Sequence, residues 1–162
     1  MDIEAIKAIF TTLPVDVVAT VLFAVAITVI TLRLGASLAI SLSLSLTVSN
    51  VLFSFLPDTF MVGPAVSKLA SATVAGGIFV GLLVVMTLVF YRIMSTLSDD
   101  SARPMFAIAT GLATTAVVLT MWQVTPLHTF WAFGTVFQGA FGAAYRLFWL
   151  LLAFIAFAFV RS

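Results

Sequence analysis

Residues 37–49 read SLAISLSLSLTVS, and this stretch decides the fold class because two different structures fit it. Small or weakly polar residues occupy every odd position, and aliphatic residues occupy every even position. An alternation with period two is typical of a half-buried β-strand. The same residues wrapped into a helix form two polar stripes on roughly opposite sides. The composition and the neighbouring segments decide between these structures.

The composition indicates that lipid surrounds most of the chain. Hydrophobic residues make up 63% of the 162 residues and charged residues make up 8%, whereas an ordinary globular domain has about 25% charged residues. One small core cannot hide this much apolar surface from water, so a bilayer is the expected solvent and partner. The net charge of +1, with no basic cluster, argues against nucleic acid as a partner.

A lone alternating segment is unsuited to a membrane strand. A strand in a bilayer has to belong to a closed barrel, because an open edge leaves backbone groups without hydrogen bonds. A barrel needs many alternating segments of about ten residues, and here residues 37–49 are accompanied by continuous apolar runs. Each backbone group left without a hydrogen bond in lipid costs several kcal/mol. This cost outweighs the preference of these residues for a strand, which is worth under about 1 kcal/mol. The sequence therefore predicts an all-α fold, a polytopic helical membrane bundle.

Long apolar runs predict about five transmembrane helices in a single integral membrane domain, residues 1–162. A helix needs about 20 apolar residues to cross the ~30 Å of hydrocarbon. The expected spans are residues 14–34, 36–56, 69–91, 104–124 and 142–160. Before the first span, residues 1–12 place isoleucines on one face, which predicts a short amphipathic helix at the interface.

The last apolar segment, residues 130–160, is too long for one untilted crossing. In one interpretation, the aromatic-rich residues 130–141 are interfacial or re-entrant, since aromatic side chains favour the headgroup zone. Gly134 and Gly139 then permit a bend. In the other interpretation, one tilted helix covers the whole segment and places Arg146 near the middle of the membrane.

The distribution of basic residues predicts the orientation. With five spans, one side of the membrane holds the N-terminus with Lys7, Lys68 and Arg146, and the other side holds Arg33, Arg92, Arg103 and Arg161. Basic residues accumulate on the cytoplasmic side of membrane proteins. We therefore expect the N-terminus outside and the C-terminus in the cytoplasm.

Small residues recur at spacings that let helices approach closely. In the second span one stripe of serines lies opposite a second stripe that contains Ser43, so we expect this helix to be central, with neighbours on both sides. Alternatively, each hydroxyl bonds the i−4 carbonyl of its own helix without special packing. The candidate packing positions are Ser37, Ser41, Ser45, Ser49, Gly77, Gly81, Gly111 and Gly139.

Polar residues inside predicted spans are candidate functional residues, because burying them in lipid is costly. These residues are Asp16, Asn50, Gln123, Gln138 and Arg146, and alternating spans bring all of them except Gln138 to the end of the bundle near the N-terminus. One hypothesis is a polar cluster in which Asp16 pairs with Arg146 and the amides complete the hydrogen bonds. The alternative is four independent interfacial residues, with the Arg146 side chain reaching the headgroups.

Catalytic motifs are missing from the sequence. It has no cysteine, one histidine (His128), and no Walker loop, GxSxG or HExxH motif. We therefore expect no enzyme activity, no cofactor and no metal. The favoured function is a packing or anchoring subunit of a membrane-embedded assembly, with other membrane subunits or further copies as partners. The alternative is a small oligomeric channel, transporter or holin-like pore that uses the Ser and Thr stripe as a polar path.

Overall fold

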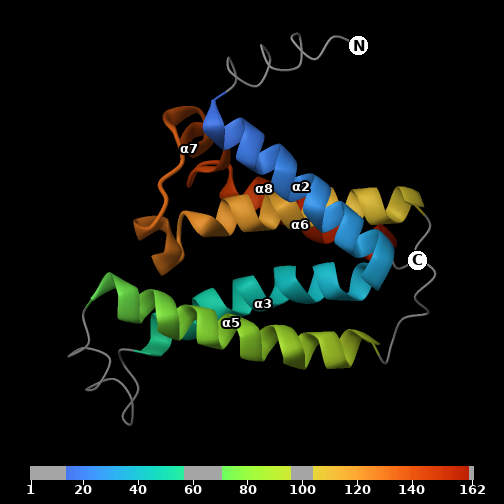
Figure 1. Cartoon of the computed structure of the whole chain (residues 1–162), viewed down its shortest axis with the longest axis horizontal. Helices are drawn as coiled ribbons and strands as arrows, with labels where there is room; N and C mark the ends of the chain where they lie inside the picture. The colour runs from blue at the N-terminus through green and yellow to red at the C-terminus, as the bar shows by residue number, and fades with distance from the viewer. Residues whose placement is uncertain (1–13, 57–70, 96–103, 161–162) are drawn as a thin grey trace.

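The computed structural model describes residues 14–56, 71–95 and 104–160 (Figure 1). The elements are α2 (Val15–Leu34), α3 (Ala36–Phe55), α5 (Ala72–Ser95), α6 (Pro104–Trp122), the 3₁₀ helix η2 (Pro126–Thr129), α7 (Thr135–Phe141) and α8 (Arg146–Val160). The part of the chain that the structure describes contains no strand, and the alternating stretch lies inside α3. The prediction of an all-helical fold is confirmed. The helix predicted at residues 1–12 lies outside the described residues.

Four helices, α2, α3, α5 and α6, are long and apolar enough to cross a membrane. They contain 20, 20, 24 and 19 residues, which corresponds to about 28–36 Å at 1.5 Å per residue. The protein is therefore suited to a bilayer as a helical bundle. Because α8 has 15 residues and spans only about 22 Å, a fifth crossing stays a prediction.

A single glycine joins α2 to α3. Gly35 has φ of 86°, a backbone conformation that residues with a Cβ rarely adopt, and its N–H donates to the carbonyl oxygen of Thr31 at 3.0 Å. The chain can therefore reverse direction without a loop. At the start of α2, Pro14 has no N–H to leave unpaired, which suits the first turn of a helix.

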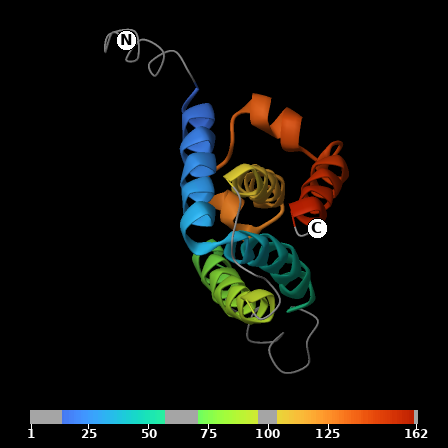
Figure 2. The same cartoon turned by 90° about the vertical axis from the view of Figure 1, so that its right-hand side faces the viewer.

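The most buried helix is α6, whereas the sequence pattern predicted a central position for the second span. Figure 2 shows α6 in the middle of the bundle, with α2, α3 and α8 around it and α5 on the outside against α3. Within the apolar window of each helix, 56% of the residues of α6 are buried, compared with 33% in α3 and 11% in α2 and α5. The Ala, Gly and Thr residues of α6 explain this position, since small side chains let three helices approach.

The apolar core lies where α3, α5, α6 and α8 meet. It contains Leu46 of α3, Phe79 of α5, Val117 of α6 and Phe157 of α8. The Phe79 and Val117 side chains are completely inaccessible. Many other large apolar side chains on α2, α5 and α8 are exposed, as expected for helices whose outer faces contact lipid.

The segment 130–160 is broken and does not form one long tilted helix. Helix α7 ends at Phe141 and α8 begins at Arg146, with Gly142 between them. A Cβ on Gly142 would overlap the carbonyl oxygen of Gln138, so the close turn between the two helices requires a glycine. Figure 1 places α7 at the end of the bundle where α6 ends and α8 begins.

Candidate functional site

Hydroxyl groups join α3 to two neighbouring helices. The Ser45 Oγ and Thr87 Oγ1 atoms lie 2.7 Å apart and link α3 to α5. Ser43 Oγ donates to Thr114 Oγ1 of α6 at 3.2 Å, and Thr114 Oγ1 donates to the carbonyl oxygen of Ala39 at 3.3 Å. The two polar stripes of α3 therefore contact different helices.

The serines of the first stripe also bond within α3. Ser41 Oγ donates to the carbonyl oxygen of Ser37 at 2.6 Å, and Ser45 Oγ donates to that of Leu42 at 3.0 Å. Ser37, Ser41, Ser45 and Ser49 are all buried, and Ser49 Oγ has no hydrogen-bond partner. Bonding within the helix and packing against a neighbour thus occur together along one stripe.

The glycines among the candidate packing positions have different surroundings. A Cβ on Gly111 would overlap Thr28 Oγ1 and would lie 2.9 Å from Thr28 Cα, so α6 and α2 are in close contact there. A Cβ on Gly77, Gly81 or Gly139 would meet nothing within 4 Å. In the described part of the chain, Gly111 packs inside the bundle and the other three have open space beside them.

The four candidate polar residues belong to helix ends that lie at the same end of the bundle (Figure 1), but their contacts differ. Asp16 Oδ2 accepts a hydrogen bond from the Gly134 N–H at 2.5 Å. An ion pair between Asp16 and Arg146 is not among the contacts of the described residues. Asn50 is half-buried near the end of α3, whereas Gln123 and Arg146 line the same cavity.

This polar cavity has a volume of about 380 Å³ and is formed by the end of α6, the segment from η2 to α7, and the start of α8. His128 and Gln138 line it together with Gln123 and Arg146. The Gln123 Nε2 and Arg146 Nε atoms are buried and have no hydrogen-bond partner. A buried donor without a partner costs about 1–3 kcal/mol, and more when the group is charged. Two unsatisfied donors therefore belong to residues in the wall of the polar cavity.

The walls of the polar cavity are held by hydrogen bonds to backbone oxygens. Gln138 Nε2 donates to the carbonyl oxygen of Phe133 at 2.6 Å. Trp122 Nε1 donates to the carbonyl oxygen of Trp131 at 2.8 Å. These bonds tie α7 and the preceding loop to each other and to the end of α6.

A row of aromatic rings connects α6 to α8 through α7. Successive ring centroids along the row are 6.1, 5.9, 5.9 and 5.0 Å apart. The rings belong to Trp122, Phe133, Phe137, Phe141 and Trp149. Contacts at these spacings are favourable beyond the burial of apolar area. The row of aromatic rings therefore holds α7 against the end of α6 and the start of α8.

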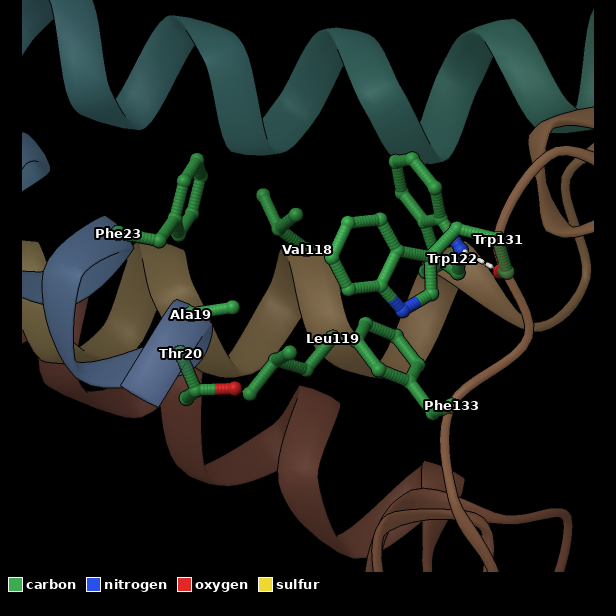
Figure 3. Close-up of a pocket in the computed structure, with 8 residues that line it drawn as sticks. All are labelled: Ala19, Thr20, Phe23, Val118, Leu119, Trp122, Trp131 and Phe133. Atoms are coloured by element: carbon green, nitrogen blue, oxygen red, sulfur yellow. Dashed lines mark hydrogen bonds between the residues drawn. The ribbon is translucent and has the colours of Figure 1, made fainter. Parts of the chain in front are cut away.

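An apolar cavity of about 240 Å³ lies beside the polar one, between α2 and α6 (Figure 3). Its lining residues are Ala19, Thr20, Phe23, Val118, Leu119, Trp122, Trp131 and Phe133. Trp122, Trp131 and Phe133 also line the polar cavity, so the two cavities share a wall. The Thr20 Oγ1 atom is buried without a partner.

Sequence reasoning placed only Gln123 and Arg146 of the polar cavity in one cluster. The Gln138 amide was identified by the same signal as Gln123, a polar side chain within an apolar segment, but was not assigned to the cluster. Trp122, Trp131 and His128 carried no such signal, because their position depends on how the segment after α6 folds back.

The described residues contain no group of three or more His, Cys, Asp or Glu side chains that could hold a metal ion. Comparison with protein-family models, curated proteins and solved structures found no match for this chain.

Proposed function

We propose that the protein is a non-catalytic, multi-pass subunit that packs or anchors a membrane-embedded assembly. The observation that carries this proposal is the glycine face of α5. Gly77 and Gly81 are one helical turn apart and both have open space at the Cβ position. Large aliphatic side chains, including Val80 and Val84, are exposed next to them. Small residues at this spacing let the backbone of a second membrane helix approach closely.

The position of α5 supports this role. It is the outermost of the four long helices and packs mainly on α3 (Figure 2). Its bond to α3 is made by Thr87, whereas Gly77 and Gly81 are exposed. A partner helix from another subunit or from a second copy can therefore occupy the glycine face without opening the bundle.

A pore along the Ser and Thr stripes receives less support. Ser43 and Ser45 are inaccessible and bond to α6 and α5. A polar path for ions needs hydroxyls that face water, and these hydroxyls are satisfied inside the bundle.

The test of the subunit proposal adds side-chain volume to the glycine face. The variant is Gly77→Ile with Gly81→Ile, and the matched control is Ala26→Ile on the exposed face of α2. The native complex is extracted in mild detergent and sized by native electrophoresis, and tagged copies report self-association. We expect the wild type and the control to migrate as a complex, and the α5 variant to migrate as a monomer with unchanged helix content. A monomeric wild type, or an α5 variant that assembles normally, contradicts the proposal.

We also propose five crossings, with α8 as the fifth, residues 1–12 as an interfacial helix, the N-terminus outside and the C-terminus cytoplasmic. Helix α8 runs back along α6 and contributes Phe157 to the core, which supports a crossing. Arg33 and Arg92, in the last turns of α2 and α5, lie at the end of the bundle away from Asp16. That end is cytoplasmic if basic residues follow their usual distribution.

The orientation can be tested with single cysteines because the chain has none of its own. Thr129 and Ser95 are exposed and lie at opposite ends of the bundle. We expect a membrane-impermeant maleimide to label Thr129→Cys in intact cells, and to label Ser95→Cys only after the membrane is opened. The reverse pattern contradicts the orientation.

A further inference from the structure

We propose that the two adjoining cavities form a binding site for an anionic amphiphile, a phospholipid. Its phosphate group is held by Gln123 and Arg146 in the polar cavity, and part of its apolar chain occupies the cavity between α2 and α6. This site is separate from the glycine face of α5, so the association proposal does not depend on it.

The polar cavity has a positive charge that no residue of its lining neutralises, so an anion is the expected ligand. Arginine stays charged in proteins, and Arg146 Nε is buried without a partner. The residues that line the cavity include no Asp or Glu. Asp16, the partner that the sequence suggested for Arg146, accepts a hydrogen bond from the Gly134 N–H.

The site is built around the two free donors. Gln138 and Trp122 use their side-chain N–H groups to bond the carbonyl oxygens of the wall. The Gln123 Nε2 and Arg146 Nε atoms have no hydrogen-bond partner, and both residues line the cavity. Arg146 is also the first residue of α8, and the positive end of a helix dipole favours an anion. Guanidinium and amide donors together suit the oxygens of a phosphate.

The neighbouring apolar cavity favours a lipid over free phosphate. Its volume of about 240 Å³ exceeds the ~150 Å³ of an apolar cavity that binds benzene. It therefore has room for several methylene groups of an acyl chain. Figure 3 shows Phe23 and Leu119 beside this space, with Trp122 and Trp131 at one side of it. Because these tryptophans line both cavities, a phospholipid that spans the two lies against their indole rings.

The binding experiment uses this contact. The full-length protein is placed in nanodiscs of phosphatidylcholine, and phosphatidylglycerol with brominated acyl chains is titrated in while tryptophan fluorescence is recorded. We expect saturable quenching at a low fraction of phosphatidylglycerol. Quenching that only rises in proportion to the brominated fraction, as for random contact with the bilayer, overturns the proposal.

Two variants change the polar half. Gln123→Glu gives Arg146 an internal partner of the same size, and Arg146→Gln removes the charge. Each is expected to weaken binding by at least about tenfold, since a charge-assisted hydrogen bond is lost. Arg33→Gln, which alters an arginine in the last turn of α2, is the matched control and should bind normally. Normal binding by Gln123→Glu overturns the assignment even if Arg146→Gln does not fold.

Two further measurements decide whether the phosphate belongs to a phospholipid or to a soluble anion. Ala19→Leu fills the apolar half and should weaken quenching by phosphatidylglycerol, whereas millimolar inorganic phosphate should compete only weakly with the lipid. If inorganic phosphate raises the thermal stability of the wild type and phosphatidylglycerol does not, the ligand is a soluble anion and the phospholipid proposal fails.

Discussion

The contact between α6 and α2 at Gly111 gives the sharpest prediction about stability. A Cβ at this position would lie 2.9 Å from Thr28 Cα, whereas ordinary contact begins at 3.4 Å, so the two helices have to separate by about 0.5 Å. Overpacking of this kind costs about 1–3 kcal/mol. Because the obstructing atom belongs to the backbone, no change of rotamer at Thr28 relieves it. We therefore expect Gly111→Ala to lower the free energy of unfolding by this amount.

The matched substitution is Gly81→Ala. It adds the same methyl group to a membrane helix, at a position where nothing lies within 4 Å. The higher helix propensity of alanine favours both variants equally, by up to about 1 kcal/mol. The difference between the two variants therefore isolates the contact with Thr28.

Unfolding of the purified protein in mixed micelles, followed by circular dichroism as the denaturing detergent is increased, measures both variants. The Gly111→Ala protein should unfold at a clearly lower detergent fraction than Gly81→Ala. Combining Gly111→Ala with Thr28→Ala removes the clash with Oγ1 but not the one with Cα, and should recover only part of the loss. Equal stability of the two single variants would refute the close α2–α6 contact.

Two further predictions concern hydrogen bonds. In a double-mutant cycle of unfolding free energies, Ser45→Ala and Thr87→Ala should be coupled by about 0.6 kcal/mol, the average for hydrogen bonds between membrane helices. The effects of Ser41→Ala and Thr87→Ala should be additive, since Ser41 bonds within its own helix. Equal coupling in the two cycles would contradict the bond between α3 and α5. Asp16→Ala removes the acceptor for the Gly134 N–H, so hydrogen exchange at that amide should become faster by about tenfold or more, and unchanged exchange measured by mass spectrometry would argue against this bond.

Composition and hydropathy were sufficient to predict the helical class. The alternation of residues 37–49 favours a strand when it is considered alone, and the cost of unpaired backbone groups in lipid decides for the helix. The same alternation placed Ser43 and Ser45 on different sides of that helix, and in the structure they contact different neighbours. These features depend on residues close together in sequence, which is why they could be predicted.

Contacts between distant segments could not be predicted in the same way. Gly77, Gly81 and Gly111 looked alike as members of small-residue motifs, yet Gly111 contacts another helix of the bundle and the other two do not. The spacing of small residues specifies a helix face but not its partner. Likewise, the partner of Asp16 is a backbone N–H of the loop before α7. Almost every residue has a backbone N–H, so the sequence does not indicate which one bonds Asp16.

The one-residue joint between α2 and α3 has a mechanical consequence. Gly35 is the one residue between α2 and α3 and its N–H donates to the carbonyl oxygen of Thr31, so the joint is an elbow with no loop to absorb a movement. Helices adjust to a thinner bilayer by tilting, and a tilt of α2 has to be passed to α3 through this elbow. Membrane thickness would then act on the serine-lined contacts of α3 from a distance, with no ligand involved.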